Sequence, residues 1–245
     1  MGTTGRRAVL RGAVGAGVAL FGAGACTRGT TEAATAATTA ATAAPRADPG
    51  PPDAAGALVR LREGNRRWQE VHPAHPHEGA EVRTSLVGGQ HPFATVLSCV
   101  DSRVPPELVF DQGLGDLLTV RTAGEVLDDA VRGSIEFGRG ELGVPLVVVL
   151  GHSSCGAVAA AVDAVDSGER APGHLAQLVA ALRPSLTATG TRAERIAAGV
   201  DTHVRRTVAA LRRDPDLAAA GPGAPAVAGA RYDLATGRVE WLETL

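Results

Sequence analysis

The sequence predicts an α/β fold in which helices flank a mostly parallel β-sheet. Short apolar runs alternate along the chain with segments of helical periodicity, which is the pattern of consecutive strand–helix–strand units. The run Val144–Gly151 is apolar on both faces, as expected of a central parallel strand. A hydrophobic content of 44% is sufficient for the core that such a sheet requires.

The individual elements follow from local patterns. Leu58, Leu61 and Trp68 recur among charged residues, so 54–71 predicts an amphipathic helix with Asp53 as its N-cap. Proline and histidine predict a loop over 71–81. Further strands are expected at Ala94–Cys99, Leu117–Arg121, Ala226–Arg231 and Arg238–Leu242, and further helices at Asp128–Arg139, Cys155–Val165, His174–Leu186 and Arg192–Arg213.

Residues 1–52 differ in composition from the rest of the chain. Arg6 and Arg7 precede a short glycine-rich apolar run, so 1–25 predicts an export signal that resembles a twin-arginine signal, an ordinary secretory signal being the alternative. Cys26 follows a sequence that resembles a lipoprotein processing site, which would anchor the chain to a membrane, unless an ordinary peptidase removes the signal. Residues 26–52 predict an Ala/Thr/Pro-rich flexible linker. We therefore expect an exported protein of the periplasm or cell envelope with one catalytic domain over 53–245.

Composition excludes several classes of function. The formal net charge is −2 and aromatic residues make up 3% of the chain, which argues against a nucleic-acid binder. Three cysteines, Cys26, Cys99 and Cys155, are too few for a disulfide-stapled scaffold.

Two motifs carry chemistry, and each follows a predicted strand. Cys99-Val100-Asp101-Ser102-Arg103 follows the first strand, and Gly151-His152-Ser153-Ser154-Cys155-Gly156 follows the strongest one. Functional groups in parallel sheets gather at the carboxyl ends of the strands, so these side chains are expected to converge. Two thiols, an imidazole and an open fourth position are a catalytic zinc pattern. A disulfide between the two cysteines, or two inert buried thiols, are the alternatives.

Together the two motifs resemble those of the β-class carbonic anhydrases. The flanking residues agree with this resemblance at 64–68 (GNRRW), 91–93 (HPF), 111–112 (DQ), 121–124 (RTAG) and 229–233 (GARYD). The likeness extends from about Ala54 to the C-terminus. Two positions depart from the family pattern: Glu125, where relatives often have Asn, and Ser154, where many carry Arg or Tyr.

The resemblance implies the reversible hydration of CO2 to bicarbonate and a proton. It implies one zinc ion per subunit, bound by Cys99, His152 and Cys155, and a catalytic pair in which Arg103 holds Asp101 away from the metal in the active state. In some members the equivalent aspartate becomes the fourth ligand instead. The resemblance further implies that Gln112 contacts a substrate oxygen, and that the chain self-associates as a dimer or tetramer through the helix around Trp68.

Two other functions remain as alternatives. Relatives of this family hydrolyse carbonyl sulfide or carbon disulfide on the same fold. A non-catalytic zinc-binding protein is the other alternative, although such a protein would need neither Asp101 nor Arg103. His72, His75 and His77 resemble a ligand cluster or a proton relay, but prolines separate them in a predicted loop.

Overall fold

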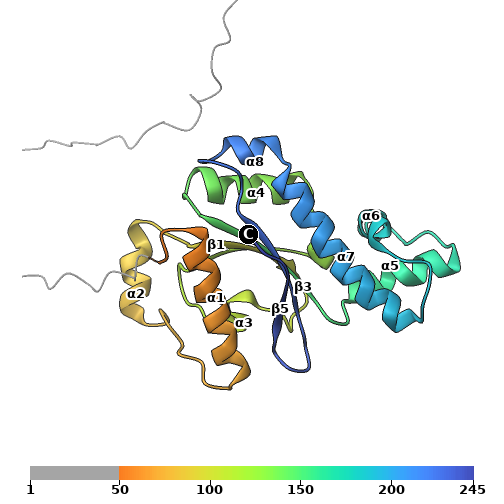
Figure 1. The fold of residues 1–245 in the computed structure, drawn as a ribbon, viewed down its shortest axis with the longest axis horizontal. Coiled ribbons are helices and arrows are strands. Elements are labelled where there is room, and N and C mark those ends of the chain that lie inside the picture. The colour runs from red at the N-terminus through yellow and green to blue at the C-terminus, as the bar shows by residue number, and fades with distance from the viewer. Residues whose placement is uncertain (1–49) are drawn as a thin grey trace, which may run out of the picture. The chain divides into compact units, whose positions relative to one another are not determined.

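The computed structural model describes residues 50–245, whose fold is shown in Figure 1. The predicted export signal, the processing site at Cys26 and nearly all of the predicted linker lie outside the described residues. One sheet has the strand order β2-β1-β3-β4-β5. Its strands are β1 (Ala94–Cys99), β2 (Leu117–Thr122), β3 (Leu146–His152), β4 (Val227–Tyr232) and β5 (Val239–Glu243). All neighbours pair in parallel except β4 and β5, so the predicted fold class is confirmed.

Helices lie on both faces of this sheet (Figure 1). They are α1 (Ala54–Gln69), α2 (Ala80–Ser85), α3 (Pro106–Val109), α4 (Asp129–Gly140), α5 (Gly156–Ser167), α6 (Leu175–Leu182), α7 (Arg192–Arg212) and α8 (Pro215–Ala219). Three short 3₁₀ turns, η1 (Leu86–Gly88), η2 (Ala123–Glu125) and η3 (Arg183–Ser185), connect them to their neighbours. Among residues 50–245, no helix has the length and apolar character needed to cross a membrane.

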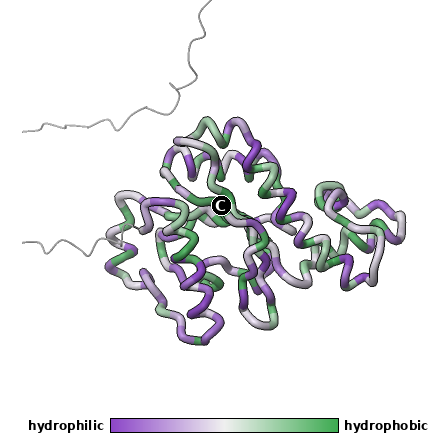
Figure 2. Tube along the Cα trace, viewed as in Figure 1, coloured by the Kyte–Doolittle hydropathy of each residue, from purple (hydrophilic) through white to green (hydrophobic). Residues whose placement is uncertain are grey.

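The alternation of side chains along the strands divides the core between the two faces. Val96 and Val148 face the cluster that contains the apolar side of α1, whereas Leu97 and Val149 face the cluster beneath α4 and α7. Figure 2 shows hydrophilic residues interspersed along the outer helices, as expected when each helix buries only one side. A third cluster, formed by α5, α6 and part of α7, includes Cys99 and Cys155.

Proline explains two boundaries at which the prediction was wrong. β3 starts at Leu146 rather than Val144, because Pro145 has no N–H to donate to a neighbouring strand. The helix predicted over 174–186 is α6 followed by the turn η3, because Pro184 cannot continue the helical hydrogen bonds. The predicted loop over 71–81 ends early, since α2 begins at Ala80.

Asn65 joins α1 to two distant parts of the fold, the end of α3 and the β4–β5 hairpin. Its side-chain amide donates hydrogen bonds to the carbonyls of Val109 and Gly237 at 3.0 and 2.8 Å. Its Oδ1 accepts from the backbone N–H of Val239 at 2.9 Å. The residue is 3% exposed, so water cannot replace these partners.

We predict that Asn65→Ala lowers the free energy of unfolding by about 3 kcal/mol, because it leaves several buried backbone groups without a partner. Urea unfolding of the purified protein measures this change. Arg66→Ala, which removes only an exposed ion pair to Glu70 on the same helix, is the control and should change stability by less than about 0.5 kcal/mol. Equal effects of the two substitutions would contradict the role of Asn65.

Candidate metal centre

The two sequence motifs meet because β1 and β3 are adjacent parallel strands. Cys99 is the last residue of β1, His152 is the last residue of β3, and Cys155 is the N-cap of α5. One ligand atom from each of the three lies within 4.8 Å of the other two, and all three residues are buried. The two cysteines are free, with their sulfur atoms 4.0 Å apart, so the disulfide alternative does not describe this structure.

The donor set fits a zinc ion. Nδ1 of His152 lies 2.9 Å from the carbonyl oxygen of Ser153, so this nitrogen carries the proton and donates it. Nε2 of His152 is then an unprotonated acceptor, and it is buried without any hydrogen-bond partner. An orphaned imidazole nitrogen beside two thiols is what a three-ligand zinc site requires, and the hydrogen bond at Nδ1 is the usual way of orienting such a ligand.

The pKa values of the Cys99 and Cys155 thiols are shifted in opposite directions. The hydrogen bond from the Cys155 thiol lowers the pKa of Cys99, and the hydrogen bond from the backbone N–H of Gly124 lowers it further. The pKa of Cys155 is raised, because this thiol donates to Cys99 and is itself buried. One negative charge is therefore favoured at the site in the absence of a cation, and the second thiolate requires positive charge nearby.

Asp101 and Arg103 form a two-pronged ion pair next to this cluster. Nε of Arg103 donates to Oδ1 of Asp101 at 2.9 Å, and Nη2 donates to Oδ2 at 2.6 Å. The guanidinium holds the pKa of the Asp101 carboxyl well below its usual range. Oδ2 lies 3.8 Å from Nε2 of His152, so the carboxylate stands beside the donor set while Arg103 holds it in place.

Sequence reasoning placed 121–124 among the residues that carry the resemblance but did not predict what two of them do at this site. Arg121, on β2, donates to the backbone carbonyls of Cys99 and Asp101 at 2.9 and 2.7 Å, which fixes the course of the chain after β1. The backbone N–H of Gly124 donates to the Cys99 sulfur at 3.3 Å. Their position at the end of a strand parallel to β1 is the signal that could have indicated both.

Comparison with known proteins assigns the family. A family model described as carbonic anhydrase matches residues 94–239, a span that includes both motifs. The chain is 47% identical over 188 residues to the carbonic anhydrase of Mycolicibacterium smegmatis, which covers 75% of this chain and 91% of that protein. It is 43% identical over 186 residues to carbonic anhydrase 2 of Mycobacterium tuberculosis, covering 74% and 89% respectively.

Solved structures define the class within that family. The fold is similar to that of the β-carbonic anhydrase CafA of Aspergillus fumigatus, with a TM-score of 0.58 and 27% identity over 76% of this chain and 89% of that one. It is also similar to a tetrameric β-carbonic anhydrase of Sordaria macrospora, with a TM-score of 0.60 and 25% identity over 76% and 96%. The chain belongs to the β-carbonic anhydrases. Both the predicted resemblance and the predicted enzyme class are confirmed.

The two departures from the β-carbonic anhydrase pattern lie in different environments. Ser154 is exposed, with a φ of 55°, between two of the three candidate ligands. Glu125 is 1% exposed, and neither oxygen of its carboxyl group has a hydrogen-bond partner. Burial raises the pKa of Glu125 well above its usual range. Ser154 therefore changes the exposed surface next to the site, whereas Glu125 changes the buried packing beside it.

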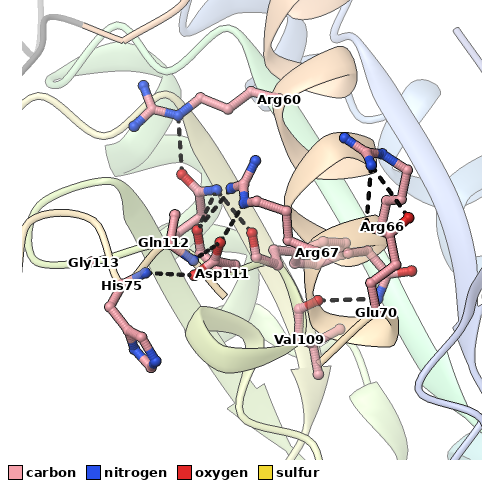
Figure 3. Close-up of polar contacts among 12 residues, drawn as sticks. Arg60, Arg66, Arg67, Glu70, His75, Val109, Asp111, Gln112 and Gly113 are labelled. Atoms are coloured by element: carbon pink, nitrogen blue, oxygen red, sulfur yellow. Dashed lines mark hydrogen bonds and ion pairs between the residues drawn. The ribbon is translucent and has the colours of Figure 1, made fainter. Parts of the chain in front are cut away.

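Gln112 is held by neighbours other than the three candidate ligands (Figure 3). Its Oε1 accepts from Nε of Arg60 at 3.0 Å, and its Nε2 donates to the carbonyls of Phe110 and Asp111, both at 2.8 Å. Contact with a substrate oxygen would require the side chain to leave these partners. The predicted role of Gln112 in substrate binding stays a prediction.

The three loop histidines have separate partners. His77 contacts the Asp116 carboxylate through Nδ1 at 2.9 Å, and His75 contacts Glu78 at 3.0 Å. His72 contacts the backbone carbonyl of Glu70 on its own segment. Each imidazole therefore interacts with a different group, which does not favour a shared ligand among them.

Asp111 anchors this loop to α1 (Figure 3). Its carboxylate accepts from Nε of Arg67 at 2.5 Å and from the backbone N–H groups of Ala74 and His75 at 2.9 and 3.1 Å. Burial alone would raise the pKa of Asp111, but these donors outweigh it and lower the pKa. The side chain is 2% exposed, so the carboxylate depends on protein donors.

We predict that Asp111 makes stability depend on pH at the acid end. Because its folded pKa lies below the unfolded value of about 3.9, its contribution is present above about pH 4 and is lost as the pH falls through the folded pKa. Unfolding free energies of the wild type and Asp111→Asn, measured from pH 2.5 to 7, should differ by a constant amount above about pH 5 and converge below about pH 4. A difference that widens towards low pH would contradict this assignment.

Proposed function

We propose that this β-carbonic anhydrase catalyses the zinc-dependent, reversible hydration of CO2 to bicarbonate and a proton. The ion would be held by Cys99, His152 and Cys155, one ion per chain. The observation that supports this proposal most strongly is the orphaned Nε2 of His152 between two buried thiols, next to a carboxylate fixed by arginine. A purely structural zinc site does not require that carboxylate.

The residues around the site have separate roles in the proposed reaction. When bound, zinc supplies Lewis acidity that makes a water molecule a nucleophile near neutral pH. Asp101 accepts a hydrogen bond from the attacking water and thereby orients its lone pair towards CO2. Arg103 keeps Oδ1 and Oδ2 of Asp101 ionised and away from the donor set. Because the pKa of Asp101 is low, this carboxylate orients the water and does not store its proton, which passes to buffer.

We predict that two substitutions separate metal binding from turnover. Cys155→Ser should lose zinc, because it replaces one of three ligands. Asp101→Ala should keep zinc but lose activity by about 100-fold or more, the scale expected of a group that positions a proton transfer. Metal analysis and stopped-flow CO2 hydration, run beside assays of sulfide release from carbonyl sulfide and carbon disulfide, measure both effects and identify the substrate.

Asp163→Asn is the matched control, because Asp163 forms a similar two-pronged pair with Arg192 on the exposed surface. It should change neither zinc content nor turnover. Unchanged turnover of Asp101→Ala would refute the role of Asp101, and full zinc content in Cys155→Ser would refute the ligand set.

We further propose that the chain self-associates as a dimer or tetramer. The similarity to the tetrameric β-carbonic anhydrase of Sordaria macrospora supports this proposal.

The proposal for location is export to the periplasm or cell envelope, with anchoring through Cys26, and it is supported by the sequence of residues 1–26. We predict that replacing Arg6 and Arg7 together by Lys retains the full-length protein in the cytoplasm of a bacterial host that has a twin-arginine translocase. Cys26→Ser should leave export intact but release the protein from the membrane fraction. Cell fractionation with immunodetection tests both outcomes, and wild-type protein confined to the cytoplasm would refute export.

A further inference from the structure

The turn η2 contacts the Cys99 sulfur and contains two residues with positive φ angles. Gly124 donates its N–H to Sγ of Cys99 at 3.3 Å with a φ of 67°. The next residue, Glu125, also has a positive φ, of 42°. Two consecutive left-handed residues, one of them with a side chain, are unfavourable in isolation, so the surroundings must hold this turn in place.

The turn is held from two sides. On one side, a Cβ added to Gly124 would lie 3.1 Å from Cβ of Ala157 and 3.3 Å from Cδ1 of Leu182, so the backbone is packed closely against α5 and α6. On the other side, the Glu125 side chain extends towards the end of β3 and towards α7.

The slot that Glu125 fills is formed by the absence of a side chain at Gly151. A Cβ on Gly151 would lie 3.1 Å from Oε1 of Glu125, 3.1 Å from Val200 and 2.7 Å from Val204. Gly151 directly precedes the candidate ligand His152. Glu125 therefore occupies the space between α7 and the strand that ends in His152, while its own backbone follows the amide that contacts Cys99.

We propose that Glu125 is a positioning residue of the metal centre, whose buried side chain seats the turn so that the Gly124 N–H points at the Cys99 sulfur. The inference rests on the zinc site proposed above. A hydrogen bond to a thiolate ligand fixes the direction of the sulfur and withdraws negative charge from it. Loss of the Glu125 side chain should therefore weaken metal binding and change the sulfur–metal bond.

Three variants test this role. Glu125→Ala empties the slot, whereas Glu125→Gln keeps its size and shape. Val208→Ala is the matched control, because it truncates another fully buried side chain of α7 that lies against Gly229 of β4 rather than in the slot beside Gly151. Zinc affinity is measured by competition with a chromogenic chelator, and the sulfur-to-metal charge-transfer band is recorded on cobalt-substituted protein.

Glu125→Ala should weaken zinc binding by about tenfold or more, the scale found when a group supporting a metal ligand is removed. It should also shift the cobalt charge-transfer band. Glu125→Gln and Val208→Ala should keep the wild-type affinity and band, even where Val208→Ala lowers thermal stability. This pattern separates an effect on the sulfur from general loosening of the fold.

Wild-type affinity and band in Glu125→Ala would overturn the inference, and so would an equal shift in Val208→Ala. If Glu125→Ala does not fold, Leu182→Ala removes the contact on the opposite side of Gly124, and an unchanged band there would overturn the inference as well. Failure of the wild type to bind zinc or cobalt would instead refute the proposed zinc site, and this proposal with it. The two failures are thus distinguished by the wild type alone.

Discussion

The parallel pairing of β1 with β3 is the constraint on which the candidate metal centre depends. In this register Ser98 lies opposite Leu150, so that Cys99 and His152 extend just beyond the paired segment at the same edge of the sheet. A slip of one residue would turn the side chains of β1 to the opposite face and remove Cys99 from the cluster. Alternate residues of both strands supply the two main core clusters. Core packing and ligand geometry are therefore specified by the same residues.

Residues from separate elements balance the negative charge at the site. Two cysteines and one carboxylate lie close together, and only a cation would make three negative charges there acceptable. Arg103 neutralises the Asp101 carboxylate locally, and the guanidinium of Arg121 lies against carbonyls of the same stretch of chain. The neutral imidazole of His152, oriented by the Ser153 carbonyl, adds a ligand without adding charge.

Sequence reasoning predicted the features that depend on local patterns. The strand Ala94–Cys99 was predicted with its observed bounds, and Asp53 was predicted as the N-cap that it forms through a hydrogen bond from Gly56. Short helices such as α3 and α8 were missed, because four or five residues cannot show a helical period.

The meeting of the two motifs was predictable because parallel strands place their carboxyl ends together. What could not be predicted depends on contacts between residues far apart in the chain. The burial of Glu125 against α7 has no signature in spacing or periodicity. The partners of Gln112 likewise follow from the packing of α1 against the loop after α3 rather than from the motif around it.

Asn65 carries a consequence for the order in which the molecule assembles. Its partners Gly237 and Val239 lie 172 and 174 positions further along the chain. During synthesis from the N-terminus, the first helix emerges long before the hairpin that completes its hydrogen bonds. Such sequence-distant closure is entropically costly and slow. The hydrogen bonds of Asn65 to Gly237 and Val239 can therefore form only after the β4–β5 hairpin has been made.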